Sequence, residues 1–135
     1  MTIVLGIDPS YACTALVWWN PYTPTVVPHV KLHLPAGPGR LLLATKRFTH
    51  AIKINGKPDL AIIENAAYGS PNRVVVGKLK ELSGVYKMVL EAMDIPYLEI
   101  APTMVKKFVT GSGKAEKHLV ASELKRRWGV VLRPL

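Results

Sequence analysis

In the stretch IVLGIDPS, residues 3–10, a series of apolar residues and one glycine ends at an aspartate, Asp8. Pro9, a residue typical of turns, follows directly. A continuous apolar run of this kind is typical of a central strand that is covered on both faces. A second run, LAII at residues 60–63, is equally apolar and also ends on an acid, Glu64. The sequence therefore predicts two buried strands that each end on a carboxylate.

The remaining elements follow from hydrophobic periodicity and from turn residues. Strands are predicted at 12–19, 26–34 and 96–100, and helices at 41–55, 73–94, 102–109 and 114–128. The expected order is three strands, a helix, a strand, the long helix, a strand and the last helices. This order predicts a mixed α/β sheet that begins as an antiparallel meander and ends with parallel strands.

Two of these segments carry further signals. Pro28 inside strand 26–34 favours the edge of the sheet, and His29, Lys31 and His33 share one face of that strand. We interpret this face as solvated, because a metal bound by the two histidines would lack a third ligand. In helix 73–94, Gly77 and Gly84 share a strip that either a dimer partner or the protein's own sheet approaches closely.

Composition restricts the class of protein. The 135 residues suit one domain, and 18 Lys and Arg against 9 Asp and Glu leave a net charge of +9, which favours nucleic acid as partner. No apolar run approaches the roughly 20 residues of a membrane helix, and the N-terminus lacks signal-peptide features. We therefore expect a cytoplasmic protein without signal peptide, membrane contact or small-molecule substrate.

The two strand-ending acids predict a metal site. If their strands are parallel neighbours, Asp8 and Glu64 meet at one end of the sheet, where the carboxylates repel each other unless a cation lies between them. Mg²⁺, or Mn²⁺ in its place, suits such oxygen ligands, and metal-activated water hydrolyses phosphodiesters. The alternative is that Asp8 only begins an Asp-Pro turn and that Glu64 is a surface acid.

Basic residues concentrate in the last third of the chain. They are Lys106, Lys107, Lys114, Lys117, Lys125, Arg126 and Arg127. Such a run is either a solvated helix face or a contact with the DNA backbone, and the clustering favours DNA. The stretch GSGKAEK at 111–117 is not a phosphate-binding loop, because Phe108 stands where glycine is needed and Ala115 where Ser or Thr is needed. We interpret its glycines as a break between two helices.

Three segments together resemble the RuvC-type Holliday junction resolvases. They are GIDPS at 6–10, IIENAAYG at 62–69 and IAPTMVKKFVTGSGKAEKHLV at 100–120. The resemblance implies an RNase H-like fold, with a five-stranded mixed sheet of three antiparallel and then two parallel strands flanked by helices. It also implies a homodimer that resolves four-way DNA junctions by Mg²⁺-dependent nicking.

The resemblance also implies roles for single residues. Asp8 and Glu64 match catalytic, metal-binding acids, and Lys117 and Lys106 match lysines around the scissile phosphate. Tyr68 falls near an aromatic residue that contacts the junction centre. Further DNA contacts are expected from Arg73, Lys107 and Lys114. The long helix that begins at Arg73 falls where the family builds its dimer contact. A dimer partner packed there would explain why Gly77 and Gly84 share one strip of the helix.

The sequence departs from the family at its end. The family closes its site with two acids on a final helix, whereas no Asp or Glu follows Glu123 here. We expect one nuclease domain over 1–135 that is cut short before that helix. The alternatives are that another acid, such as Glu116 or Glu123, completes the site, that the protein binds junctions without cleaving them, or that it is another RNase H-like nuclease acting on branched DNA or RNA.

Overall fold

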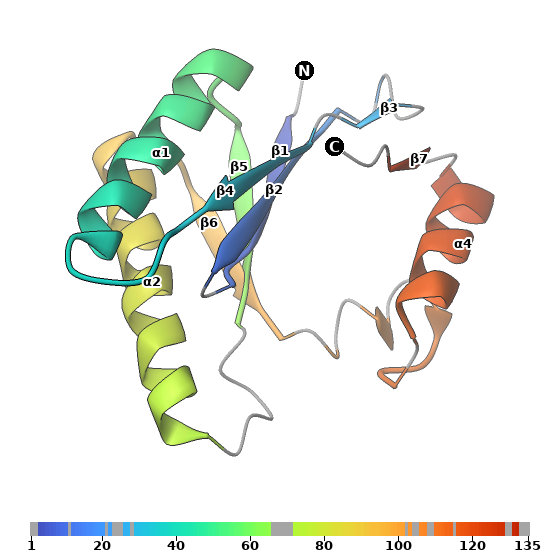
Figure 1. Cartoon of the computed structure of the whole chain (residues 1–135). Helices are drawn as coiled ribbons and strands as arrows, with labels where there is room; N and C mark the ends of the chain where they lie inside the picture. Colours follow the sequence, from blue (N-terminus) through green and yellow to red (C-terminus); the bar gives the residue numbers. More distant parts are fainter. Residues whose placement is uncertain are drawn as a thin grey trace.

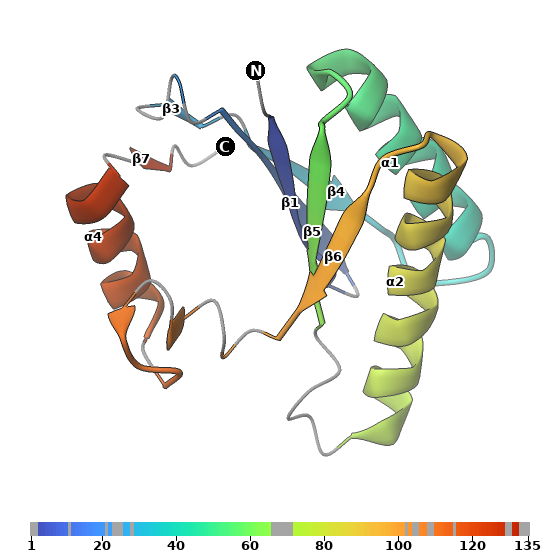
Figure 2. The ribbon, with the colours of Figure 1, turned by 180° about the vertical axis from the view of Figure 1, so that it is seen from behind.

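A computed structural model gives the fold of the chain. It describes residues 3–132 except 11, 21, 23–25, 28, 66–71, 102, 104–105, 108–109, 115 and 129–130. The main sheet has five strands: β1 (Val4–Asp8), β2 (Cys13–Trp19), β4 (His29–His33), β5 (Leu60–Glu64) and β6 (Tyr97–Ile100). Their order across the sheet is β4-β2-β1-β5-β6 (Figures 1 and 2).

The pairing confirms the predicted mixed sheet. The β1–β2 and β2–β4 pairs are antiparallel, and the β1–β5 and β5–β6 pairs are parallel. The expectation of one unbroken strand over 26–34 is wrong. Its first part, β3 (Val26–Val27), pairs in parallel with β7 (Val131–Leu132) in a second, two-stranded sheet, while β4 forms the edge of the main sheet. Pro28 stands between the two parts in the sequence and lies outside the described residues; a proline cannot donate a ladder hydrogen bond.

Helices lie on both sides of the main sheet. α1 (Arg40–Asn55) and α2 (Arg73–Ala92) pack together on one side, and α4 (Lys117–Trp128) stands on the other (Figures 1 and 2). The sequence predicted these helices to within three residues at each end, whereas most of the predicted 102–109 helix lies outside the described residues. Within the part that is described, no helix is long and apolar enough to cross a membrane.

The core lies between the sheet and the α1–α2 layer. α1 buries Ala44, Phe48, Ala51 and Ile52, and α2 buries Leu82, Tyr86, Val89 and Leu90. The rings of Phe48 and Tyr86 meet with their centroids 4.7 Å apart. Leu41 and Val75, whose helical spacing continues the apolar stripes of α1 and α2, are 38% and 40% exposed. Both lie in the first turns of their helices, and α2 there extends past the end of the sheet (Figure 1).

One buried polar contact joins the sheet to α2. The hydroxyl oxygens of Thr14 in β2 and Tyr86 in α2 are 2.6 Å apart, and both side chains are fully buried. Removal from water raises the pKa of Tyr86 to about 12, although the hydrogen bond with Thr14 opposes this shift. This contact links α2 to β2 within the core.

The two faces of the sheet differ in how well they are covered. Leu5, Ile7 and Ile63 alternate toward the α1–α2 layer and are buried. The residues between them, such as Val4 and Ile62, point to the other face and are only half-buried. The second face is therefore the more accessible one.

Candidate functional site

The parallel pairing of β1 and β5 determines where the two predicted acids lie. Its register pairs Val4 with Leu60 and, at the far end, Ile7 with Ile63. Asp8 and Glu64 are the next residues of their strands, and neighbouring strands lie about 4.8 Å apart. The two carboxylates therefore project from laterally adjacent backbone positions at the carboxyl ends of β1 and β5.

The alternation of side chains gives both acids the same face. Ile7 and Ile63 are buried under α1 and α2, so by the alternation of a strand Asp8 and Glu64 project to the opposite, more accessible face. Asp8 is exposed and Glu64 is half-buried. Two carboxylates at such positions repel each other through Coulomb interaction, and a shared cation relieves the repulsion.

The donor set suits a hard divalent ion. Among the residues that the structure describes, no group of three or more His, Cys, Asp and Glu side chains could hold a metal. Mg²⁺ commonly binds through one or two carboxylates and takes its other ligands from water and from substrate phosphates. Asp8 and Glu64 therefore fit Mg²⁺ or Mn²⁺, and we expect binding without substrate to be weak.

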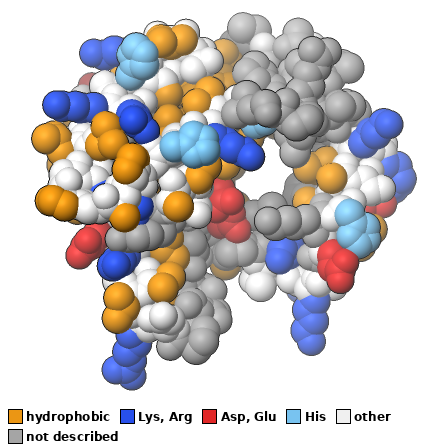
Figure 3. All heavy atoms as spheres, viewed as in Figure 1, with side chains coloured by type: hydrophobic (Ala, Val, Ile, Leu, Met, Phe, Trp, Pro, Cys, Tyr) orange, Lys and Arg blue, Asp and Glu red, His pale blue; other side chains and the backbone are white. Residues whose placement is uncertain are grey.

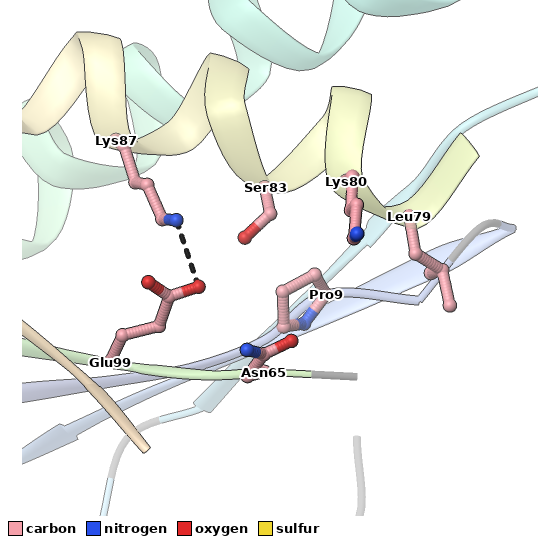
Figure 4. A pocket seen from close by; sticks show the side chains of 7 residues that line it. All are labelled: Pro9, Asn65, Leu79, Lys80, Ser83, Lys87 and Glu99. Atoms are coloured by element: carbon pink, nitrogen blue, oxygen red, sulfur yellow. Dashed lines mark hydrogen bonds and ion pairs between the residues drawn. The ribbon is translucent and has the colours of Figure 1, made fainter. Parts of the chain in front are cut away.

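A pocket that the sequence did not predict lies behind these acids. Its volume is about 280 Å³, and it is lined by Pro9 and Asn65, which directly follow the two acids, by Leu79, Lys80, Ser83 and Lys87 of α2, and by Glu99 of β6. Lys87 Nζ lies 2.8 Å from Glu99 Oε1, and Ser83 and Lys80 point into the same space (Figure 4). Only the packing of α2 against the strand ends brings these residues together.

The predicted lysines of the 106–114 region lie before and after a helical segment that ends at Gly111. Lys106, which is half-buried, and the exposed Lys107 have helical backbone. The Gly111 N–H donates to the Lys107 carbonyl at 2.8 Å, and Gly111 has a φ of 85°, which favours glycine. The interpretation of the glycines as a helix break is therefore confirmed, and Lys114 lies exposed just beyond it.

Charges on α4 are partly paired within the helix. Arg126 Nη2 lies 2.7 Å from Glu123 Oε2, and the hydrogen bonds from Arg126 lower the pKa of the Glu123 carboxyl. Glu123, which the sequence offered as a possible extra metal ligand, is thus engaged by Arg126. Lys125 and Arg127 are exposed.

Of three further residues predicted to contact DNA, the structure describes the surroundings of only one, Arg73. Arg73 is the exposed first residue of α2, whose N-cap Asn72 accepts from the Val74 N–H at 3.0 Å. Tyr68 lies outside the described residues, as does the side chain of Lys117 in the first turn of α4. Lys and Arg side chains appear both on the part built from the sheet, α1 and α2 and on the part that carries α4 (Figure 3).

Comparison with known proteins agrees with this architecture. The family model described as "Crossover junction endodeoxyribonuclease RuvC" matches residues 4–128. The chain is 32% identical over 79 residues to a crossover junction endodeoxyribonuclease RuvC from Gloeobacter violaceus, a match that covers 58% of this chain and 44% of that relative. It is 30% identical over 140 residues to the one from Syntrophomonas wolfei, and this match covers 97% of this chain and 78% of the relative.

Solved structures share the fold. Thermus thermophilus RuvC in complex with a Holliday junction substrate superposes with a TM-score of 0.79 at 18% identity, covering 100% of this chain and 84% of that chain. The yeast mitochondrial Holliday junction resolvase gives a TM-score of 0.69 at 12% identity, covering 98% of this chain and 65% of that chain. At these identities the similarity is one of fold.

Proposed function

Because the chain belongs to the RuvC crossover junction endodeoxyribonuclease family, we propose that it is a homodimeric, metal-dependent nuclease of the cytoplasm that resolves four-way DNA junctions. Members of this family are typically metal-dependent. The observation that carries the proposal is the pair of carboxylates, Asp8 and Glu64, at adjacent positions beyond the Ile7–Ile63 pair of two parallel strands. A strongly basic chain supplies the matching attraction for DNA.

The proposed chemistry is hydrolysis of one phosphodiester by each subunit. Asp8 and Glu64 would hold a divalent ion, which when bound supplies an activated water and stabilises charge on the leaving oxygen. Lys117 and Lys106 neutralise the phosphate that is cleaved, and Lys107 and Lys114 hold neighbouring phosphates. These contacts position the strand but do not read its sequence.

Two other residues are assigned to the junction itself. Tyr68 stacks on bases at the junction centre and helps to open it, since aromatic side chains stack on unpaired bases of any sequence. Arg73, exposed at the first residue of α2, contacts a backbone phosphate beside it. The assignment of Tyr68 rests on the correspondence with the family, and that of Arg73 on its exposed charge at the start of α2.

The outward side of α2 supports dimerisation through this helix. Val74, Gly77, Glu81, Gly84 and Met88 follow one another at spacings of three and four, which is the spacing of a helix–helix seam, and all five are exposed. A Cβ built on either glycine would meet nothing within 4 Å in the described structure. The alternative that these glycines pack on the protein's own sheet is therefore wrong, because the buried stripe of α2 lies on its other side.

Dimer geometry would provide the selectivity for junctions. Two glycines seven residues apart allow the backbones of two α2 helices to approach closely. Such a dimer carries two pairs of carboxylates in a fixed relation, which suits two opposed strands of one four-way junction. Duplex DNA offers the same phosphates but lacks that arrangement of strands.

One observation favours a second candidate function, that of a junction-binding protein without nuclease activity. Within the described part of the chain, only Asp8 and Glu64 come together as carboxylates suited to a metal at the strand ends. A single pair leaves most ligands of an octahedral ion to water and substrate. A protein of this kind would bind the junction and leave it intact.

The test compares labelled four-way junction, flap, duplex and DNA–RNA hybrid substrates of equal length. Binding is measured by mobility shift in EDTA, and cleavage is measured after addition of Mg²⁺ or Mn²⁺. We expect preferential binding of the four-way junction and paired nicks in two opposed strands. Retention of the junction without nicks supports the binding protein, and preferred cleavage of another substrate supports a different RNase H-like nuclease.

A further inference from the structure

The register of the sheet aligns a lysine with the two carboxylates. Asp8 pairs with Ala15 of β2, and Ala15 pairs with Lys31 of β4. Glu64 is the neighbour of Asp8 on the other side, one position beyond the Ile7–Ile63 pair. Glu64, Asp8, Ala15 and Lys31 therefore form one row across four strands, and directly paired residues share a face of the sheet.

A single small residue separates the acids from the lysine along this row. Two steps between strands separate the backbones of Asp8 and Lys31 by about 10 Å. The residue between them, Ala15, contributes only a methyl group and is half-buried. The lysine ammonium is carried on a flexible four-carbon stem, so it can lean along the row toward the carboxylates.

Two histidines flank Lys31 on the same face of the edge strand β4. Lys31 is exposed, and among the described residues it takes part in no ion pair. His29 and His33 lie two residues away on either side, pair with Val17 and Cys13, and share its face of the sheet. Lys or Arg and His side chains gather over β4 in Figure 3, with acidic side chains next to them beside the opening toward α4.

We propose that Lys31 binds a backbone phosphate of the nicked strand close to the scissile phosphate, with His29 and His33 as flanking hydrogen-bond donors. This inference rests on the proposed function, because it requires a DNA strand at Asp8 and Glu64. A DNA strand whose scissile phosphate lies at the carboxylates continues across the accessible face of the sheet. If it follows the row of paired residues, it passes over Ala15 and reaches β4. In this way β4, at the edge of the sheet, guides the DNA strand toward the two carboxylates.

A structural role for Lys31 is the competing explanation. Lysines on edge strands also prevent a sheet from pairing with another chain. In that role, replacing Lys31 would change solubility or self-association and leave DNA binding unchanged. The two roles are therefore separated by the salt dependence of junction binding.

The first experiment compares Lys31→Ala with Lys46→Ala, a matched control on the exposed outer side of α1. Junction affinity is measured without metal over about 50 to 200 mM salt. For Lys31→Ala we expect a slope of log affinity against log salt that is smaller by about 0.9, and an affinity about two- to fivefold lower. Lys46→Ala should leave both unchanged.

The second experiment locates the phosphate. Single neutral methylphosphonates replace the phosphates on either side of the scissile one, and each substrate is bound by wild-type and Lys31→Ala protein. At one of these positions neutralisation should weaken wild-type binding about two- to fivefold and have no further effect on Lys31→Ala. Additive effects at every flanking position would refute the contact.

The outcomes also separate this inference from the proposed function. If the wild-type protein does not bind the four-way junction, both are overturned. If it binds the junction and Lys31→Ala behaves like Lys46→Ala, only the role of Lys31 is overturned. Far-ultraviolet circular dichroism of both variants checks that the exposed substitutions leave the fold intact.

Discussion

The buried contact between Thr14 and Tyr86 gives a sharp test of how α2 is held on the sheet. Tyr86→Phe removes one hydroxyl and leaves the Thr14 hydroxyl, 2.6 Å away, buried without that partner. A buried polar group without its partner costs about 1–3 kcal/mol of folding free energy. We therefore expect Tyr86→Phe to lower the free energy of unfolding by that amount at neutral pH.

The pKa of Tyr86 adds a dependence on pH with a definite sign. Burial raises this pKa from 10.0 to about 12, so the folded protein holds the phenol proton more tightly than the unfolded chain does. The resulting stabilisation is fully present below pH 10 and is lost as the pH rises toward about 12. By proton linkage it amounts to roughly 2–3 kcal/mol.

Urea unfolding of the wild type, Tyr86→Phe and Thr14→Val/Tyr86→Phe at neutral and alkaline pH measures both effects. Above about pH 10 the wild type should lose stability more steeply than Tyr86→Phe, because the variant lacks the titrating phenol. The difference between them should therefore shrink. The double variant should recover most of the loss at neutral pH, because removing both partners leaves no unpaired hydroxyl.

Tyr22→Phe is the matched control, since the Tyr22 side chain is 73% exposed. It should change the free energy of unfolding little at neutral pH. The reasoning would be refuted if Tyr86→Phe were as stable as the wild type at neutral pH. It would also be refuted if the difference between the two stayed constant up to about pH 12.

Gly84→Leu should keep the protein monomeric in sedimentation, because a leucine side chain prevents the close approach of two α2 helices. It should not destabilise the monomer, since leucine favours a helix over glycine by roughly 1 kcal/mol. Lys46→Leu on α1 is the control, and a dimeric Gly84→Leu protein would exclude the α2 seam. Phe48→Ala, at a fully buried position, should lower the free energy of unfolding by about 3–5 kcal/mol in urea, and a loss below about 1 kcal/mol would contradict the packing. Gly111→Val should cost about 1–3 kcal/mol in the same assay, because Gly111 has a φ of 85°; no cost would contradict that backbone conformation.

The sequence predicted the sheet because each strand carries a local signal. Two continuous apolar runs, each ending on an acid, indicated central parallel strands, and Pro28 indicated the edge strand. Periodicity was less reliable where a helix extends past the sheet. Leu41 and Val75 follow the apolar spacing of α1 and α2 but are exposed, and the first turn of α2 extends past the end of the sheet (Figure 1). Spacing gives the side of a helix, and tertiary packing decides how far along that side burial extends.

Features that depend on register or on packing between distant elements were not predictable. No sequence pattern near Thr14 predicts its hydrogen bond with Tyr86, which is 72 residues away. The pocket beside Pro9 and Asn65 depends on how α2 crosses the strand ends. Lys31 was correctly interpreted as exposed, but its alignment with Asp8 follows only from the pairing of β1 with β2 and of β2 with β4.

The most direct test of the account is junction nicking in Mg²⁺ by three variants compared with the wild type. Asp8→Asn and Glu64→Gln each remove one of the two adjacent carboxylates, and Asp59→Asn removes a carboxylate at the opposite end of β5, where it accepts from the Ile3 N–H at 2.7 Å. We predict that the first two abolish nicking and retain binding, while Asp59→Asn keeps both. Undiminished nicking by either Asp8→Asn or Glu64→Gln would contradict a metal held jointly by this pair.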